Sequence, residues 1–303
     1  MITTEQKLIA SGLTESTAVQ YVKRLMRLNK GKTFTNLAYL RKTKDIMEYM
    51  KNDMKLNDTS MESYLAMIIS IFSKLPSKGN DKARNDFEDI LNNPNDYFVK
   101  RDRSVKTENQ KKGWIEKEQF DKYVNEANER GLVASRKKKN FTTKDYNDIL
   151  NYFVISLYTL LPPRRNKDYQ IMKVNTEEGN RLDTKTMEMI FTDYKTSTTY
   201  GEQKMDIKQY PQFAKVLKLY LKRKPESEYL LVNHEGQNFK QNNSMTRLLN
   251  KIFGGNKVSS TAIRSMYLST KYGGEQNEEM KKDAEDMGHS IQQQQTAYIK
   301  TDE

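Results

Sequence analysis

The stretch from Tyr146 to Leu161 is the most apolar helical pattern in the chain, and it limits the fold more than any other feature. Its apolar residues recur at the three- and four-residue spacing of a helix, so the pattern predicts a buried helix. Pro162 and Pro163 follow directly and end this helix, because proline has no backbone N–H and cannot continue it. The apolar positions are Tyr146, Ile149, Leu150, Phe153, Val154, Leu157, Tyr158 and Leu161.

A strand pattern follows the two prolines. Residues Met187 to Tyr194 alternate between apolar and polar side chains, and Gln203 to Ile207 can pair with them across a connection at 196–201. A further helix opens at Tyr210 and Pro211, and helical patterns continue from there. This order predicts an α+β domain that is mainly α-helical and contains a small antiparallel sheet.

The first hundred residues show only helical patterns. Apolar residues recur at helical spacing over 18–26 and over 37–50, with a break near Thr43. A capping box at 59–62 predicts the start of another helix, and a further short helix is expected over 81–91. We therefore predict a small helical domain at the N-terminal end.

A basic stretch with almost no apolar residue separates the two predicted domains. It covers residues 100–113 and is typical of a linker, so we place the domains at 1–99 and 114–303. A second basic run is expected in an exposed loop. Both runs are candidates for contact with DNA phosphates. Their basic residues are Lys100, Arg101, Arg103, Lys106, Lys111 and Lys112 in the linker, and Arg136, Lys137, Lys138 and Lys139 in the loop.

The composition favours a polyanionic partner. Lys and Arg exceed Asp and Glu by 52 to 40, which gives a net charge of +12 and suits nucleic acid or an anionic membrane surface. The chain has no cysteine, which excludes disulfides and thiol catalysis, and its two histidines make a clustered metal site unexpected. It shows neither the apolar core of a signal peptide nor a membrane span of ~20 residues, so we expect a soluble intracellular protein.

The most specific motif lies near the C-terminal end. The sequence Asp-Met-Gly-His-Ser at 286–290 contains His289, and Tyr298 follows nine residues after that histidine. This pattern resembles the end of the catalytic domain of tyrosine recombinases of the phage-integrase type, in which Gly-His precedes the nucleophilic tyrosine. The resemblance implies three partners upstream: an arginine after a buried helix, a lysine in a hairpin, and an arginine about two dozen residues before the histidine.

The first of these partners is Arg165, which follows the predicted buried helix. Family members commonly carry an acidic residue three positions after this arginine. Arg165 has Asp168 there, whereas Arg164 has Lys167, so the resemblance favours Arg165 and implies that Asp168 braces the arginine region.

The other two partners are Lys195 and Arg264. Lys195, in Tyr-Lys-Thr-Ser at the expected end of the first hairpin strand, fits the catalytic lysine better than Lys204 on the returning strand. Arg264 lies in a stretch that resembles the family's His-x-x-Arg box, but Thr261 replaces the usual histidine. Threonine can donate a hydrogen bond to a phosphate but cannot act as a general acid, so the role of proton donor passes to Lys195.

The chemistry that the resemblance implies is attack by Tyr298 on a backbone phosphate. The attack forms a 3′-phosphotyrosine and releases a 5′-hydroxyl. Arg165, Arg264 and His289 would hold the phosphate oxygens, because a guanidinium fork matches two of them at once, and Lys195 would protonate the leaving oxygen. Such a site requires no metal, ATP or other cofactor.

The expected partner is double-stranded DNA, clamped between the two domains. The resemblance implies a homo-tetramer on two DNA sites, and a monomer or dimer without DNA. The Pro-Pro-Arg-Arg and Tyr-Lys-Thr-Ser forms resemble versions from large DNA viruses or their mobile elements. Two other interpretations remain open: a nicking-closing enzyme similar to type IB topoisomerases, and a relative that binds DNA without catalysis, for which Thr261 is the only indication.

Overall fold

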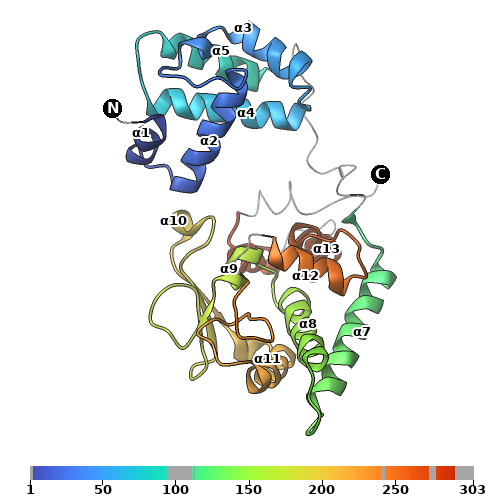
Figure 1. Ribbon diagram of the computed structural model, residues 1–303. Coiled ribbons are helices and arrows are strands. Elements are labelled where there is room, and N and C mark those ends of the chain that lie inside the picture. The colour runs from blue at the N-terminus through green and yellow to red at the C-terminus, as the bar shows by residue number, and fades with distance from the viewer. Residues whose placement is uncertain (1–2, 94–110, 112, 240–242, 273–277, 291–303) are drawn as a thin grey trace. The chain divides into compact units, whose positions relative to one another are not determined.

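The computed structural model describes residues 3–93, 111, 113–239, 243–272 and 278–290. The chain divides into two compact units, Met1–Asp102 and Arg103–Glu303 (Figure 1). Each unit buries a hydrophobic core of its own. Within the described ranges, no helix is both long and apolar enough to cross a membrane.

The described part of the first unit is helical throughout, as its sequence predicted. A break before Thr43 and a short helix over 81–91 are both confirmed. The elements are α1 (Thr4–Ala10), α2 (Glu15–Leu28), the 3-10 helix η1 (Ala38–Arg41), α3 (Thr43–Glu48), the π-helix η2 (Tyr49–Asp53), α4 (Asp58–Lys74) and α5 (Asn80–Asn92).

Helix α4 is the apolar centre of the first unit. Leu65 and Ile68 are fully buried there, which stabilises helices that are too short to persist alone. The capping box predicted at 59–62 is wrong as the start of this helix. Asn57 caps it instead, because its side-chain oxygen accepts a hydrogen bond from the backbone N–H of Ser60 at 2.9 Å.

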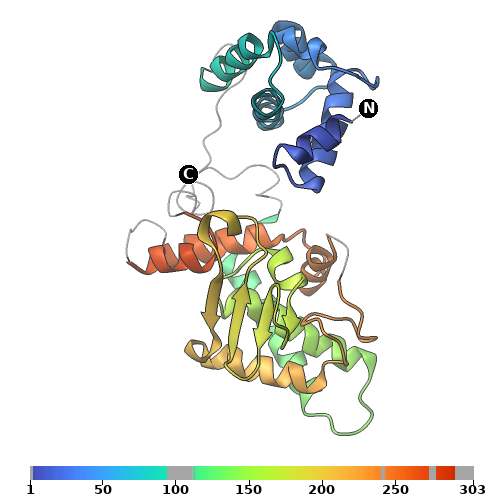
Figure 2. The ribbon, with the colours of Figure 1, turned by 90° about the vertical axis from the view of Figure 1, so that its left-hand side faces the viewer.

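The second unit combines helices with one sheet, which confirms a mainly α-helical α+β domain (Figure 2). Its helices are α7 (Lys117–Ser135), α8 (Thr143–Thr159), α9 (Asn166–Gln170), α10 (Ser197–Tyr200), the 3-10 helix η4 (Ile207–Gln209), α11 (Pro211–Arg223), α12 (Ser244–Ile252), α13 (Ser260–Tyr272) and α14 (Glu278–Asp286). Its strands are β1 (Lys173–Val174), β2 (Arg181–Asp183), β3 (Glu188–Phe191) and β4 (Gln203–Asp206).

The sheet has the strand order β1-β2-β3-β4. The antiparallel pair β3–β4 is the one predicted; β2, which the sequence did not predict, also pairs antiparallel with β3, and the two-residue strand β1 pairs with β2 in parallel. Strand β3 ends at Phe191, where it lies opposite Gln203, so the strand predicted through Tyr194 is three residues too long. As a consequence, Lys195 lies in the turn before α10 and not at the end of a strand.

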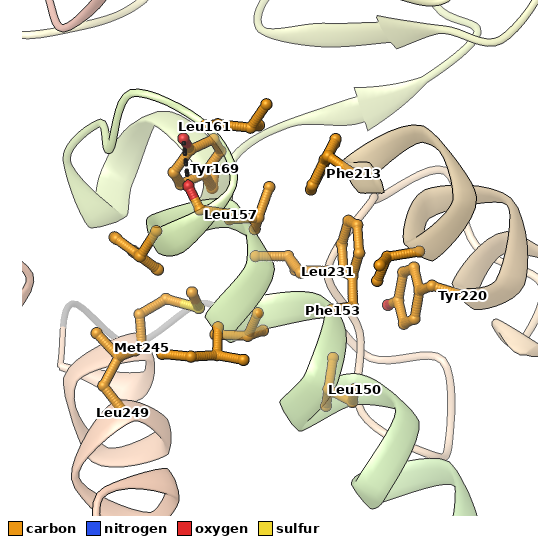
Figure 3. Close-up of a cluster of buried hydrophobic side chains, with 14 of the residues drawn as sticks. Leu150, Phe153, Leu157, Leu161, Tyr169, Phe213, Tyr220, Leu231, Met245 and Leu249 are labelled. Carbon is orange, nitrogen blue, oxygen red and sulfur yellow. Dashed lines mark hydrogen bonds between the residues drawn. The ribbon is translucent and has the colours of Figure 1, made fainter. Parts of the chain in front are cut away.

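Helix α8 forms the centre of the second core, as its sequence predicted. Phe153 is fully buried and stacks on Tyr220 of α11, with the ring centroids 4.2 Å apart, and its ring is 5.8 Å from that of Phe213 (Figure 3). The helix ends before Pro162 and Pro163, and the chain then turns into α9. This turn carries Arg164 and Arg165.

Candidate active site

Three of the predicted site residues, Arg165, Arg264 and His289, lie close together at the end of α8. Burial and, to a smaller extent, the positive charges of Arg264, Arg165 and Arg164 together lower the pKa of the His289 imidazole to about 3. Contacts link the same segments directly: Nε of Arg264 donates a hydrogen bond to the carbonyl of Pro163 at 3.0 Å. Residues about 125 positions apart in the chain thus share one site.

Arg164 is fully buried and contacts protein groups from several elements. Its Nε forms an ion pair with Asp168 at 3.1 Å, and its Nη1 donates hydrogen bonds to the side chain of Gln203 at 2.7 Å and to the carbonyl of Asp286 at 2.5 Å. The rings of Phe191 and Tyr194 lie 4.0 and 4.8 Å from its Cζ. This arginine therefore joins α9, the sheet and α14.

The C-terminal end of α14 is held by side chains of the sheet region, and we call these contacts the α14 clasp. The last carbonyls of a helix have no partner within it and require donors from elsewhere. Here the carbonyls of Glu285, Asp286 and Gly288 accept hydrogen bonds from three side chains. These donors are Gln203, Arg164 and Thr196, the last with a distance of 2.6 Å to Gly288.

Gly288 is required by this geometry. Its φ of +67° lies in the left-handed region, which favours glycine, and a Cβ at this position would lie 3.1 Å from the ring of Tyr194. The glycine therefore lets the chain turn tightly against the sheet. Directly after it, His289 is buried, and its Nδ1 lies 3.2 Å from the carbonyl of Ser290. Because a carbonyl only accepts, Nδ1 donates in this contact.

Arg164 and Arg165 differ in how many of their guanidinium N–H groups bond to protein groups. Arg164 uses Nε and Nη1 in contacts with protein groups, although its Nη2 has no partner among the described residues. Arg165 is half-buried at the N-terminal end of α9, and its buried Nη1 has no hydrogen-bond partner in the described part of the chain. Arg165 therefore keeps donor groups for a ligand, whereas Arg164 mainly holds the fold together.

The site carries more positive than negative charge. Three guanidinium groups meet one buried carboxylate, Asp168, whose pKa is raised by burial although Arg164 and Arg165 act to lower it. Buried charge is costly unless it is paired, so this excess favours an anion at the site. Arginine forks match two oxygens of a phosphate or carboxylate at once.

Lys195 and Thr261 lie on the exposed side of these elements. Lys195 is exposed and forms no ion pair with a described residue, while its neighbour Thr196 binds the carbonyl of Gly288. Lys204 lies on β4, 3.6 Å from Glu202. Thr261 is exposed on α13, one turn before Arg264.

The remaining predicted residues lie away from this site or outside the described residues. Lys111 is exposed, and the loop between α7 and α8 presents its basic run to solvent, although Lys137 forms an ion pair with Asp145 at 2.7 Å. Among the described residues there is no group of three or more His, Asp or Glu side chains that could hold a metal ion. The predicted residues outside the described ranges are Tyr298, Lys100, Arg101, Arg103, Lys106 and Lys112.

Sequence reasoning missed Gln203 and the structural role of Arg164. The only sequence signal for Arg164 is its place beside Arg165 after the two prolines. That signal makes both arginines candidates for the phosphate contact, but it does not indicate a structural role for Arg164. Gln203 carries no local signal, because its role depends on the approach of α14 to β4.

No protein-family model matches this sequence, and no curated protein does. Among solved structures, the chain is similar to the crystal structure of XerA recombinase, with a TM-score of 0.44 and 11% identity over 97% of this chain and 91% of that one. Values this low carry neither the fold nor the function of one protein to the other.

We expect Arg164→Met to destabilise the second unit, because it leaves Asp168 buried without its ion pair and removes a donor from the α14 clasp. The cost should be on the order of 3 kcal/mol in the free energy of unfolding. Arg130→Met is the matched control: its partner Glu126 lies at 3.6 Å on the exposed face of α7, and the loss should stay below about 1 kcal/mol. Urea denaturation of both variants measures the difference, and equal losses would contradict the role of Arg164.

The stability of the folded chain should depend on pH through His289. Its pKa in the folded chain is about 3, against 6.5 for an ordinary histidine. Between these values the unfolded chain binds a proton that the folded chain does not, so His289 lowers the free energy of unfolding as the pH falls below about 6.5. We expect wild type to lose more stability than His289→Gln between about pH 7 and about pH 4. Urea denaturation at both pH values tests this, and parallel losses would show that the imidazole is not buried in its neutral form.

Proposed function

We propose that this chain is a tyrosine recombinase, an enzyme that cuts and rejoins DNA through a 3′-phosphotyrosine intermediate. One observation carries the proposal: the guanidinium groups of Arg164, Arg165 and Arg264 gather around His289, and Asp168 is the fully buried carboxylate that pairs with them in the described part of the chain. Such a site suits the phosphate of a DNA backbone, whose non-bridging oxygens gain negative charge as the phosphorus is attacked. The motif that resembles the family supplies Tyr298 nine residues after this histidine.

In this proposal Arg165 and Arg264 hold the two non-bridging oxygens. Arg165 has donor groups to offer because Arg164 supplies the structural contacts of the region. The hydrogen bond from Arg264 to the Pro163 carbonyl fixes the position of its guanidinium before substrate binds. Preorganised donors lower the barrier because they do not have to reorient during the reaction.

His289 would be the third contact to the phosphate. Its pKa of about 3 makes the free ring neutral at pH 7, with Nδ1 donating to Ser290. A bound phosphate opposes the effect of the arginines and raises the pKa of the ring, which favours the protonated form in which both nitrogen atoms donate. In the proposed complex, protonation of the ring is therefore more favourable than in the free site.

Lys195 would protonate the leaving 5′-oxygen. It is exposed, so it can reach a substrate that lies over the site, and its turn is joined to the His289 segment by the hydrogen bond from Thr196 to Gly288. Thr261, one turn before Arg264, would donate a hydrogen bond to the same phosphate. The covalent phosphotyrosine preserves the energy of the broken bond, so rejoining needs no ATP. DNA is accordingly the proposed partner, with a tetramer on two sites as the proposed assembly.

Tyr298→Phe tests the proposal directly. With a nicked suicide duplex, wild type should form a protein–DNA adduct that resists denaturant, whereas the variant should bind the same duplex without forming it. Phenylalanine removes only the nucleophilic hydroxyl, so binding serves as the internal control. An adduct in the variant would refute the assignment of Tyr298. Binding without an adduct in wild type would indicate a relative that has lost catalysis, and plasmid relaxation without recombination would indicate a topoisomerase-like enzyme.

Arg165→Lys should slow adduct formation by about 100-fold or more, because an ammonium group cannot hold two phosphate oxygens as a guanidinium fork does. Arg181→Lys is the matched control. Arg181 lies on β2, pairs with Glu202 at a distance of 3.7 Å and is not one of the predicted site residues, so the rate of this variant should equal that of wild type. The rate is followed by denaturing gel under single-turnover conditions. A wild-type rate in Arg165→Lys, together with an inactive but folded Arg164→Lys, would assign the phosphate contact to Arg164.

A further inference from the structure

Two segments of the second unit, α11 and the loop at 136–142, carry exposed cations and contain no acidic residue. Helix α11 contains no Asp or Glu. Its residues Lys215, Lys218 and Lys222 are exposed and lie on one face, because they are three and four positions apart. The opposite face buries Phe213 and Tyr220 against α8. The helix therefore presents a line of positive charge to solvent.

The loop between α7 and α8 extends this line. Arg223, the last residue of α11, donates hydrogen bonds to the carbonyls of Ser135 at 3.2 Å and Lys137 at 2.6 Å. Its guanidinium also lies 4.8 Å from the ring centroid of Phe141. These contacts hold the basic loop against the end of α11. We call the exposed cations of both segments the lysine face: Arg136, Lys138, Lys139, Lys215, Lys218 and Lys222.

The lysine face keeps its charge unneutralised. None of its six residues forms an ion pair with a described carboxylate, whereas other lysines of the same unit do, each within 2.8 Å of an acidic side chain. Exposed lysines often serve only to keep a surface soluble. Solubility alone, however, does not explain why Arg223 holds two segments without acidic residues together. The paired lysines are Lys117 with Asp121, Lys144 with Asp148, and Lys173 with Glu228.

The loop residues of the lysine face and Lys222 lie at the end of α8 that is remote from the arginine site, and Lys218 and Lys215 lie farther back along α11. The C-terminal end of α11 is held to the loop that precedes α8, since Arg223 donates hydrogen bonds to the carbonyls of Ser135 and Lys137. The C-terminal end of α11 therefore lies beside the start of α8, and Arg165 follows its other end (Figures 1 and 2). The 17 residues of α8 span about 25 Å.

We propose that the lysine face binds the phosphate backbone of a second DNA segment while the arginine site holds the first. The proposal rests on the function proposed above only for the identity of the polyanion. Lysine ammonium groups act as point charges and suit phosphates without reading bases, so the binding is independent of sequence. The segment is either a flank of the bound duplex that bends back or a separate duplex.

Lysine acetylation followed by mass spectrometry tests this with the full chain. The Tyr298→Phe variant is used, so the outcome does not depend on cleavage. We expect a long duplex to reduce modification of Lys215, Lys218 and Lys222 several-fold and to leave Lys173 unchanged. Protection by a long duplex but not by excess short duplex identifies a flank, and protection by both identifies a separate duplex. Bound DNA without protection would overturn the proposal, as would protection by polyglutamate but not by DNA, which would indicate an acidic protein.

Substitution of the three α11 lysines by Gln gives an independent measure. Each lost phosphate contact lowers the slope of log K against log salt by about 0.9, so the variant should lose about 2.7 in slope for a long duplex. Its rate of adduct formation with a short nicked duplex should not change. Gln at Lys117, Lys144 and Lys173, which are paired, is the matched control and should keep the wild-type slope. An unchanged slope in the α11 variant would overturn the proposal even if no adduct forms in any variant.

Discussion

The arrangement of the second unit depends on the contacts that the buried guanidinium of Arg164 makes. A charge without access to water must be paired and hydrogen-bonded, or it destabilises the fold. Its partners come from three elements that are distant in sequence: Asp168 from α9, Gln203 from β4 and the Asp286 carbonyl from α14. The requirement to satisfy one side chain therefore determines how α14 meets the sheet, and with it where His289 lies.

Strong periodicity made α8 predictable, and its proline stop located the arginines that follow. Short elements were not predictable, because strands of two and three residues such as β1 and β2 show no alternation. The start of α4 was placed two residues late, since Asn57 also has a capping side chain and the sequence does not show which candidate is used. The motif spacing predicted that Arg165, Arg264 and His289 share one site. The contacts that position them arise from tertiary packing and were not predictable.

Positive charge serves the second unit in two physically different ways. At the arginine site, the guanidinium groups of Arg164 and Arg264 are buried and held by hydrogen bonds, so the cost of desolvating them is met during folding. On the lysine face, ammonium groups stay hydrated on flexible side chains and respond to salt. A basic composition alone does not distinguish these uses, and the difference lies in which cations the fold removes from water.

The α14 clasp acts on backbone carbonyls, and this has a consequence for how the sequence can change. The helix is held through Glu285, Asp286 and Gly288 without use of their side chains, so most substitutions along its exposed positions leave the contacts intact. The residues that supply the donors have no such freedom. Constraint on the sequence therefore falls on the donor residues and on Gly288, while the exposed positions of α14 can diverge without moving the segment that carries His289.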